Sequence, residues 1–151
     1  MIEIVLFEPE IPQNTGSVAR LCAGTDIRLH LIEPLGFSLA DRYLKRAGLD
    51  YWPHVQVRVH ASWEARLAEA APGRIVLTSA RRGPALHRFA FAPDDTLVLG
   101  PETRGLPEAL WSRYEGVRIP IWGEVRSLNL STAAGVVLYE ALRQTGGLEG
   151  K

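Results

Sequence analysis

Short apolar runs alternate with amphipathic stretches along the chain. Six of the runs are typical of buried or half-buried strands, at residues 2–7, 28–33, 55–60, 74–79, 96–100 and 117–121. Four stretches carry apolar residues at helical spacing, at about 14–24, 39–47, 62–71 and 129–144. Ser62 is a candidate N-cap for the third of these helices. The alternation predicts an α/β fold with a mostly parallel sheet flanked by helices.

The overall composition is that of an ordinary globular protein. The 151 residues are 46% hydrophobic and 23% charged, with a formal net charge of zero. Length and the uniform pattern predict a single domain over residues 1–151, with 146–151 as a tail and no separate RNA-binding domain. No apolar run approaches the roughly 20 residues of a membrane span, and the N-terminal segment is too acidic for a signal peptide. We therefore expect a cytoplasmic protein with no membrane partner.

Three segments that follow predicted strands are dense in glycine, proline and polar residues, and they lie at 8–20, 100–107 and 122–131. In parallel α/β sheets, ligands bind beyond the carboxyl ends of the strands. The last segment leads into a helix with more short polar side chains than one cap requires: Arg126, Ser127, Asn129, Ser131 and Thr132. These segments are therefore candidates for one ligand site.

Familiar catalytic motifs are missing from the chain. The first strand is not followed by G-x-G-x-x-G, and GPETRG continues with Leu106-Pro107 where a phosphate-binding loop needs Lys-Ser/Thr. The four histidines lie far apart, Cys22 is the only cysteine, and neither H-E-x-x-H nor a nucleophile elbow occurs, so we expect no metal site. The remaining inventory of amides, hydroxyls, one glutamate and arginines favours the positioning of a reactive cofactor.

Five segments, in order and spacing, resemble the motifs of the SPOUT superfamily of RNA methyltransferases. They are PEIPQNTGSVARLC (9–22), LIEPLGF (31–37), RAGLDYW (46–52), GPETRGLP (100–107) and RIPI…VRSLNLSTAAGVVLYEALRQ (118–144). Within the superfamily the chain resembles the small tRNA 2′-O-methyltransferases that modify the wobble cytidine or uridine of the anticodon. The resemblance implies a C-terminal trefoil knot, S-adenosylmethionine as cofactor without a metal, a homodimer, and the tRNA anticodon loop, not DNA, as partner.

The resemblance also implies roles for particular residues. Those that match cofactor-binding positions are Leu77, Thr78, Gly100, Ile119, Ser127 and Leu128. Those that match catalytic positions are Asn14, Arg20, Glu102, Ser127 and Asn129. Gly100 is expected to let the main chain approach a ligand closely. Structural roles stay open beside these, because Asn14 and Asn129 are also candidate helix caps and Glu102 a candidate acid at a helix N-terminus.

A ribose 2′-oxygen attacks a methyl group poorly unless its proton is removed or polarised. A guanidinium is a poor base, so we expect Arg20 to bind a flanking phosphate and to stabilise the developing alkoxide.

The acceptor RNA is less readable from the sequence. The chain has fifteen Arg and two Lys, and two basic groups are candidate RNA contacts or plain solvated surface: Arg81, Arg82 and Arg88, and Arg42, Lys45 and Arg46. Trp122 and Glu124 depart from the small or polar residues frequent in the family. Two alternatives therefore stay open: 2′-O-methylation at another tRNA or rRNA position, and a catalytically silent RNA-binding module.

Overall fold

The structure is a computed structural model that describes residues 1–48, 54–69 and 73–151. Six strands form one sheet: β1 (Glu3–Phe7), β2 (Arg28–Ile32), β3 (Val57–His60), β4 (Ile75–Ser79), β5 (Thr96–Leu99) and β6 (Gly116–Arg118). Their order is β3-β2-β1-β5-β4-β6, and every recorded pairing is parallel. The predicted α/β fold with a parallel sheet is confirmed, whereas the knot stays a prediction.

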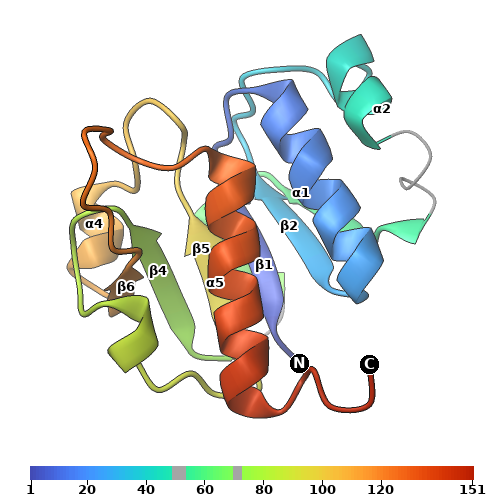
Figure 1. Ribbon diagram of the computed structural model, residues 1–151. Coiled ribbons are helices and arrows are strands. Elements are labelled where there is room, and N and C mark those ends of the chain that lie inside the picture. The colour runs from blue at the N-terminus through green and yellow to red at the C-terminus, as the bar shows by residue number, and fades with distance from the viewer. Residues whose placement is uncertain (49–53, 70–72) are drawn as a thin grey trace.

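The described residues form five α-helices: α1 (Pro12–Thr25), α2 (Arg42–Gly48), α3 (Trp63–Glu69), α4 (Glu108–Trp111) and α5 (Leu130–Thr145). Helices α1 and α5 lie side by side over one face of the sheet (Figure 1). Trp63 of α3 and Leu110 of α4 pack on the opposite face. The sheet is thus the middle layer of three, as is usual for a parallel sheet with helical connections.

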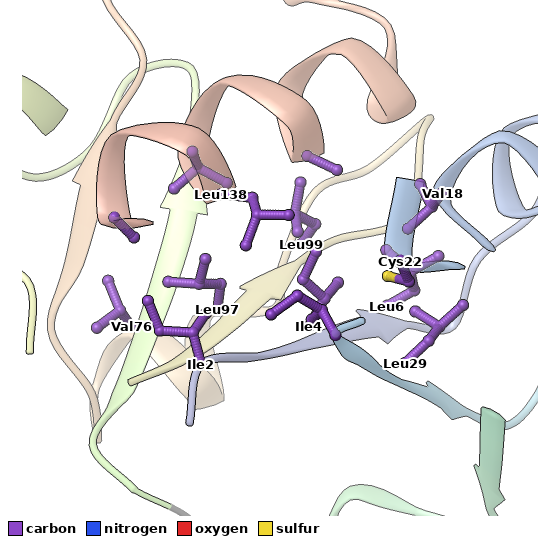
Figure 2. Close-up of a cluster of buried hydrophobic side chains, with 14 of the residues drawn as sticks. Ile2, Ile4, Leu6, Val18, Cys22, Leu29, Val76, Leu97, Leu99 and Leu138 are labelled. Atoms are coloured by element: carbon purple, nitrogen blue, oxygen red, sulfur yellow. The ribbon is translucent and has the colours of Figure 1, made fainter. Parts of the chain in front are cut away.

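The period of two along each strand divides the apolar core between the two faces of the sheet. Ile4 and Leu6 of β1 face α1 and α5, where they meet Val18, Cys22 and Leu138 (Figure 2). The intervening residues of β1 contribute to the second cluster, under α3 and α4. Because both faces of the sheet are covered, the strands β1, β4 and β5 are largely apolar, and this explains why their sequences read as continuous apolar runs.

Several predicted boundaries are wrong, each for a local reason. The first helix begins at Pro12 instead of residue 14, because proline suits the first helical position. The helix predicted over 39–47 begins at Arg42, where the Asp41 carboxylate accepts the Tyr43 N–H at 2.7 Å. The predicted last strand over 117–121 ends at Arg118, shortly before a proline that has no N–H to donate.

Two short elements were not predicted at all: α4 and the 3-10 turn at Leu86–Arg88. Ser62 does cap α3, because its Oγ accepts the Ala65 N–H at 3.0 Å. Residues 49–52 of the predicted RAGLDYW motif lie outside the described residues.

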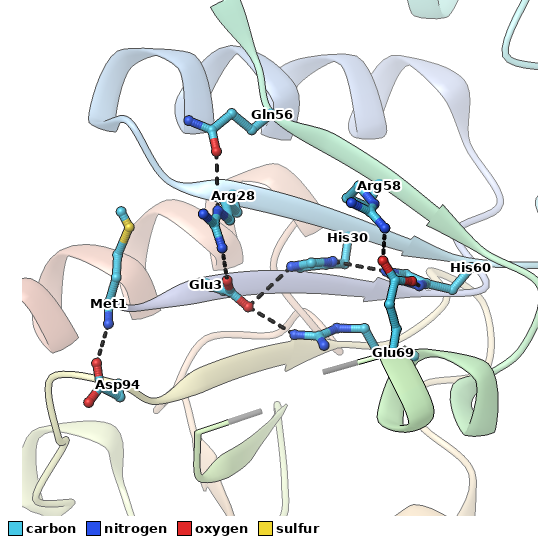
Figure 3. A network of polar contacts seen from close by, with 10 residues as sticks. Met1, Glu3, Arg28, His30, Gln56, Arg58, His60, Glu69 and Asp94 are labelled. Atoms are coloured by element: carbon cyan, nitrogen blue, oxygen red, sulfur yellow. Dashed lines mark hydrogen bonds and ion pairs between the residues drawn. The ribbon is translucent and has the colours of Figure 1, made fainter. Parts of the chain in front are cut away.

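A buried polar network ties β1, β2, β3 and α3 together (Figure 3). His30 Nδ1 lies 2.9 Å from His60 Nε2, and His30 Nε2 lies 3.1 Å from the Glu3 carboxylate. Arg66 donates to the same carboxylate at 2.9 Å. Burial, and then the positive charge of Arg66, lower the pKa of His30 to about 4.

This histidine is expected to make the stability of the fold depend on pH. Its pKa in the folded protein, about 4, is below the ordinary value of 6.5, so between these values the unfolded chain binds the proton and the folded chain does not. The free energy of unfolding should therefore be highest above pH 6.5 and fall towards pH 4, by up to about 3 kcal/mol from His30. Urea unfolding of wild type and His30→Gln across this pH range measures how steeply the free energy of unfolding of each protein changes with pH.

The substitution also removes a buried hydrogen bond and so lowers stability at every pH. This loss is the same at each pH, so it does not affect the slope of the free energy of unfolding against pH. The matched control is His54→Gln, at an exposed histidine, which should retain the wild-type slope. Equal slopes for wild type and His30→Gln would contradict the assignment of this pH dependence to the lowered pKa of His30.

Candidate functional site

A cavity of about 910 Å³ lies at the carboxyl ends of β4 and β5 and beside the loop that follows β6. Its walls come from residues 78–82, 99–106 and 126–130, from Ile119, Ile121 and Ala133, and from Ile11 and Asn14 at the start of α1. Each of the three polar segments singled out in the sequence therefore contributes to one cavity. Volume and position are those of a small-molecule site in a parallel α/β sheet.

Glu102 joins the first polar segment to the second. One carboxylate oxygen accepts the Glu10 N–H at 2.8 Å, and the other accepts the Ile11 N–H at 2.9 Å. The second oxygen also accepts from Asn14 Nδ2 at 3.1 Å. The interpretation of Glu102 as a helix N-terminal acid is wrong, since α4 begins six residues later, at Glu108. Glu102 instead fixes the start of α1 against the loop after β5.

Asn129 joins the third segment to the first and explains the surplus of polar side chains before α5. Its Oδ1 accepts from the Ser131 N–H at 2.9 Å and from Ser131 Oγ at 2.6 Å, as an N-cap should. Its Nδ2 donates to Asn14 Oδ1 at 3.0 Å. Asn129 is thus both a cap and a cross-link.

Asn14, by contrast, does not cap α1, because that helix begins at Pro12 and its N-cap residue, Ile11, makes no side-chain cap hydrogen bond. The Asn14 amide is used instead for the chain Glu102–Asn14–Asn129, which connects all three polar segments. This chain holds three of the five predicted catalytic residues in fixed orientations. Ser127 is exposed and lines the cavity nearby.

Five of the six predicted cofactor-binding residues line the cavity: Thr78, Gly100, Ile119, Ser127 and Leu128. Leu77 is not among the described residues that line it. Its side chain is fully buried in the core cluster under α3 and α4, so the Leu77 assignment stays a prediction.

The expected reason for Gly100 needs a correction. A β-carbon at this position would lie 2.6 Å from the Leu106 nitrogen and 2.8 Å from the Gly105 carbonyl carbon. Glycine is therefore required by the close turn of the protein's own loop over 100–106, and not only by the approach of a ligand. That turn brings Glu102 back towards the first segment.

The lining of the cavity fits an adenosyl group. Ile119 and Leu128 provide apolar surface for the faces of a base. Among the described residues the buried Thr78 Oγ1 finds no hydrogen-bond partner, although it belongs to a residue of the cavity wall. An unpaired buried hydroxyl costs about 1–3 kcal/mol, so a polar group of a ligand at this position would be favoured.

We expect Thr78→Val to separate ligand binding from stability. The substitution removes the unpaired hydroxyl and leaves a side chain of similar shape, so the protein alone should be as stable as wild type or slightly more so. Affinity for S-adenosylhomocysteine should fall by about 3- to 10-fold if the hydroxyl binds the ligand. Calorimetric titration and thermal unfolding measure the two effects, and unchanged affinity would contradict this use of Thr78.

Arg20 is placed differently from the other predicted catalytic residues. Its side chain is exposed on α1, and it is absent from the described residues that line the cavity of its own chain. The catalytic role of Arg20 therefore stays a prediction.

Two polar cross-links near the cavity escaped prediction. The Glu10 carboxylate accepts the Thr103 N–H and hydroxyl, both at 2.8 Å, and these hydrogen bonds lower the pKa of Glu10. Arg104 donates to Glu8 at 2.8 Å. Both pairs bridge the first and second segments across more than ninety positions in the chain, and nothing in local spacing distinguishes these residues from surface charges.

Two other kinds of feature are absent from the part of the chain that the structure describes. It contains no group of three or more His, Cys, Asp or Glu side chains arranged to hold a metal ion. None of its helices combines the length and the apolar character needed to cross a bilayer.

Comparison with known proteins points to RNA methylation. Residues 1–139 match the sequence profile of the SpoU rRNA Methylase family. The tRNA (cytidine(34)-2′-O)-methyltransferase of Methylovorus glucosotrophus (strain SIP3-4) is 52% identical over 148 residues, 95% of this chain and 96% of that protein. The corresponding enzyme of Escherichia coli (strain K12) is 46% identical over 149 residues, 97% of this chain and 95% of that protein.

Solved structures agree with these matches. One, from work on the 2′-OH methylation of C/U34 on tRNA, has a TM-score of 0.91 and 52% identity, with 95% of each chain covered. The SpoU methyltransferase AviRb of Streptomyces viridochromogenes, solved in complex with the cofactor AdoMet, has a TM-score of 0.80 and 27% identity, and the match covers 95% of this chain and 60% of that one.

Proposed function

The chain belongs to the SpoU rRNA Methylase family, and we propose that it transfers a methyl group from S-adenosylmethionine to the 2′-oxygen of the wobble cytidine or uridine in a tRNA anticodon. The observation that carries the proposal is the hydrogen-bonded chain Glu102–Asn14–Asn129 on the wall of the cavity. Relatives named for this reaction on cytidine(34) match nearly the whole chain. A silent RNA-binding module has no need for such a preorganised set of side chains.

The cofactor supplies an electrophilic methyl group on a sulfonium. Thr78, Ile119 and Leu128 would hold its adenosyl part, with Gly100 and Ser127 at the edge of the same cavity. Transfer forms the bond from the ribose oxygen to the methyl carbon, breaks the carbon–sulfur bond, releases S-adenosylhomocysteine and passes the hydroxyl proton to water. The ribose hydroxyl has to be oriented for this in-line attack, a task that suits the fixed amides of Asn14 and Asn129.

Arg20 has the electrostatic task in this scheme. Its guanidinium binds the phosphate beside the target ribose and stabilises negative charge on the attacking oxygen. Because Arg20 is exposed outside the cavity of its own chain, a homodimer would have to bring it to the cavity of the partner subunit. An exposed stripe on α5, with Val136 at 38% and Tyr139 at 48% exposure, offers apolar area for such a contact.

The proposed setting is the cytoplasm, with tRNA as the macromolecular partner and neither DNA nor a membrane involved. The rival hypotheses place the methyl group at another tRNA position or on rRNA. Methyl transfer to an RNA that cannot be methylated at the wobble ribose distinguishes them from the proposal.

The test is methyl transfer to defined RNAs. Wild-type protein with S-adenosylmethionine labelled in the methyl group should label a tRNA transcript that carries cytidine or uridine at the wobble position. The same transcript with a 2′-deoxynucleotide at that single position should take up no label. Label on the deoxy transcript would place the methyl group on a base or at another nucleotide, and so contradict the proposal.

A further inference from the structure

Trp122 is presented to solvent beside the mouth of the cavity. Its exposed fraction is 93%, the highest among the exposed large hydrophobic side chains of the described chain. The residue belongs to the segment that connects β6 to α5, directly after Ile121, which lines the cavity. An indole left in water forgoes the large gain that burial of an aromatic ring provides. Its position therefore favours a partner that covers it during function.

The charges around this loop indicate what kind of partner that is. Arg81 and Arg126 are exposed and line the same cavity. Within residues 1–48, 54–69 and 73–151, neither guanidinium has an acidic partner, whereas the neighbouring Arg82 pairs with Glu108 and Arg104 with Glu8. A covering surface has to supply both anions for two arginines and a flat apolar face for an indole. An unpaired nucleotide with its flanking phosphates has both.

We propose that Trp122 stacks on an unpaired base of the substrate RNA next to the target nucleotide, while Arg81 and Arg126 bind the adjoining phosphates. This inference rests on the proposed function, and it names how the same site recognises single-stranded RNA. Stacking on an aromatic ring tolerates any base, and arginine suits phosphate because its planar fork can donate two hydrogen bonds. Trp122 then acts in affinity and positioning and takes no part in the methyl transfer itself.

Substitutions at this position should have graded effects that depend on the ring. Trp122→Ala should weaken RNA binding by about 5- to 100-fold and raise KM for RNA with little change in kcat. Trp122→Phe, which keeps a ring, should stay within about threefold of wild type, whereas the apolar but non-aromatic Trp122→Leu should resemble alanine. Val125→Ala, at a 62% exposed residue of the same loop, is the matched control and should bind as wild type.

The experiment measures binding of a labelled anticodon stem-loop RNA by fluorescence anisotropy in the presence of S-adenosylhomocysteine. Intrinsic fluorescence is recorded in the same titrations, because stacking on a base quenches an indole. The quench assigned to Trp122 is the part present in wild type and lost in Trp122→Phe, although that variant still binds. RNA affinity falls as the salt concentration rises, and Arg81→Gln should make the plot of log affinity against log salt concentration less steep by about 0.7.

The inference is supported if the RNA affinities follow this order and all variants bind S-adenosylhomocysteine with the same affinity, which shows that the cavity is intact. Equal RNA affinity of wild type and Trp122→Ala overturns it, and so does full affinity of Trp122→Leu. A change in subunit association of Trp122→Ala, measured by sedimentation, also overturns it, because a second copy of the chain would then cover the indole. The expected binding pattern without methyl transfer by wild type overturns the proposed function alone, whereas transfer with uniform binding overturns the stacking alone.

Discussion

Replacement of Arg20 by alanine is expected to lower the rate of methyl transfer by about 100- to 1000-fold, with affinity for S-adenosylhomocysteine within about twofold of wild type. The reason is electrostatic, because the guanidinium stabilises an alkoxide that develops only in the transition state. Cofactor affinity should hardly change, because Arg20 is assigned to the phosphate and the attacking oxygen of the RNA and to no group of the cofactor. Single-turnover kinetics and calorimetry measure the two quantities.

Two further variants make this result specific. Arg20→Lys keeps the charge but loses the fork, and should recover only part of the rate. Ser17→Ala changes another exposed residue of α1 and should leave the rate unchanged. A loss of cofactor affinity as large as the loss of rate would contradict the assignment of Arg20 to the transition state.

The position of Arg20 also predicts complementation between two inactive variants. In a mixed dimer of Arg20→Ala and Asn129→Ala, one cavity has an intact Asn129 and receives an intact Arg20 from the partner subunit. Co-refolding of equal amounts should therefore restore about a quarter of the wild-type rate, since half of the dimers are mixed and one of their two sites is complete. An arginine that acts within its own chain would give no recovery.

The second large effect is expected at Glu102. Glu102→Ala removes the acceptor of two main-chain N–H groups and of Asn14, so the free energy of unfolding should fall by about 2 kcal/mol. The rate should fall as well, by about 10- to 100-fold, because Asn14 and through it Asn129 lose their orientation. Urea unfolding and initial rates measure both effects on the same preparation.

The matched control is Glu108→Ala, which removes an exposed carboxylate whose partner is the exposed Arg82. Surface ion pairs contribute about 0–1 kcal/mol, so this variant should be nearly as stable as wild type. Wild-type stability of Glu102→Ala would show that the loops at residues 8–14 and 100–106 hold together without the carboxylate, and would contradict its structural role.

The strands could be predicted because a parallel sheet covered on both faces leaves continuous apolar runs in the sequence. The strand order β3-β2-β1-β5-β4-β6 could not, since it depends on contacts between distant elements that leave no local pattern. Boundaries failed where one residue changes the backbone, as Pro12 does at the start of α1. The short α4 failed because four residues are too few for a helical period to be visible.

The site was predictable in its parts and not in its connections. Asn14, Glu102 and Asn129 were identified through family resemblance, and the structure brings them into one hydrogen-bonded chain. The partners Glu10 and Thr103 were missed because they are 93 positions apart and meet only after the sheet has formed. Arg20 is the opposite case. Its motif position is visible in the sequence, but the sequence does not indicate whether its side chain acts at the cavity of its own chain or at that of a partner subunit.

The most direct test of the central claim is identification of the methylated nucleoside. Unmethylated bulk tRNA is incubated with wild-type protein and S-adenosylmethionine, digested to nucleosides and analysed by mass spectrometry, with Arg20→Ala as the parallel control. We predict new 2′-O-methylcytidine or 2′-O-methyluridine that is absent from the control. A nucleoside methylated on its base, or no methylated product from protein that binds S-adenosylhomocysteine, would contradict ribose methylation of tRNA by this chain.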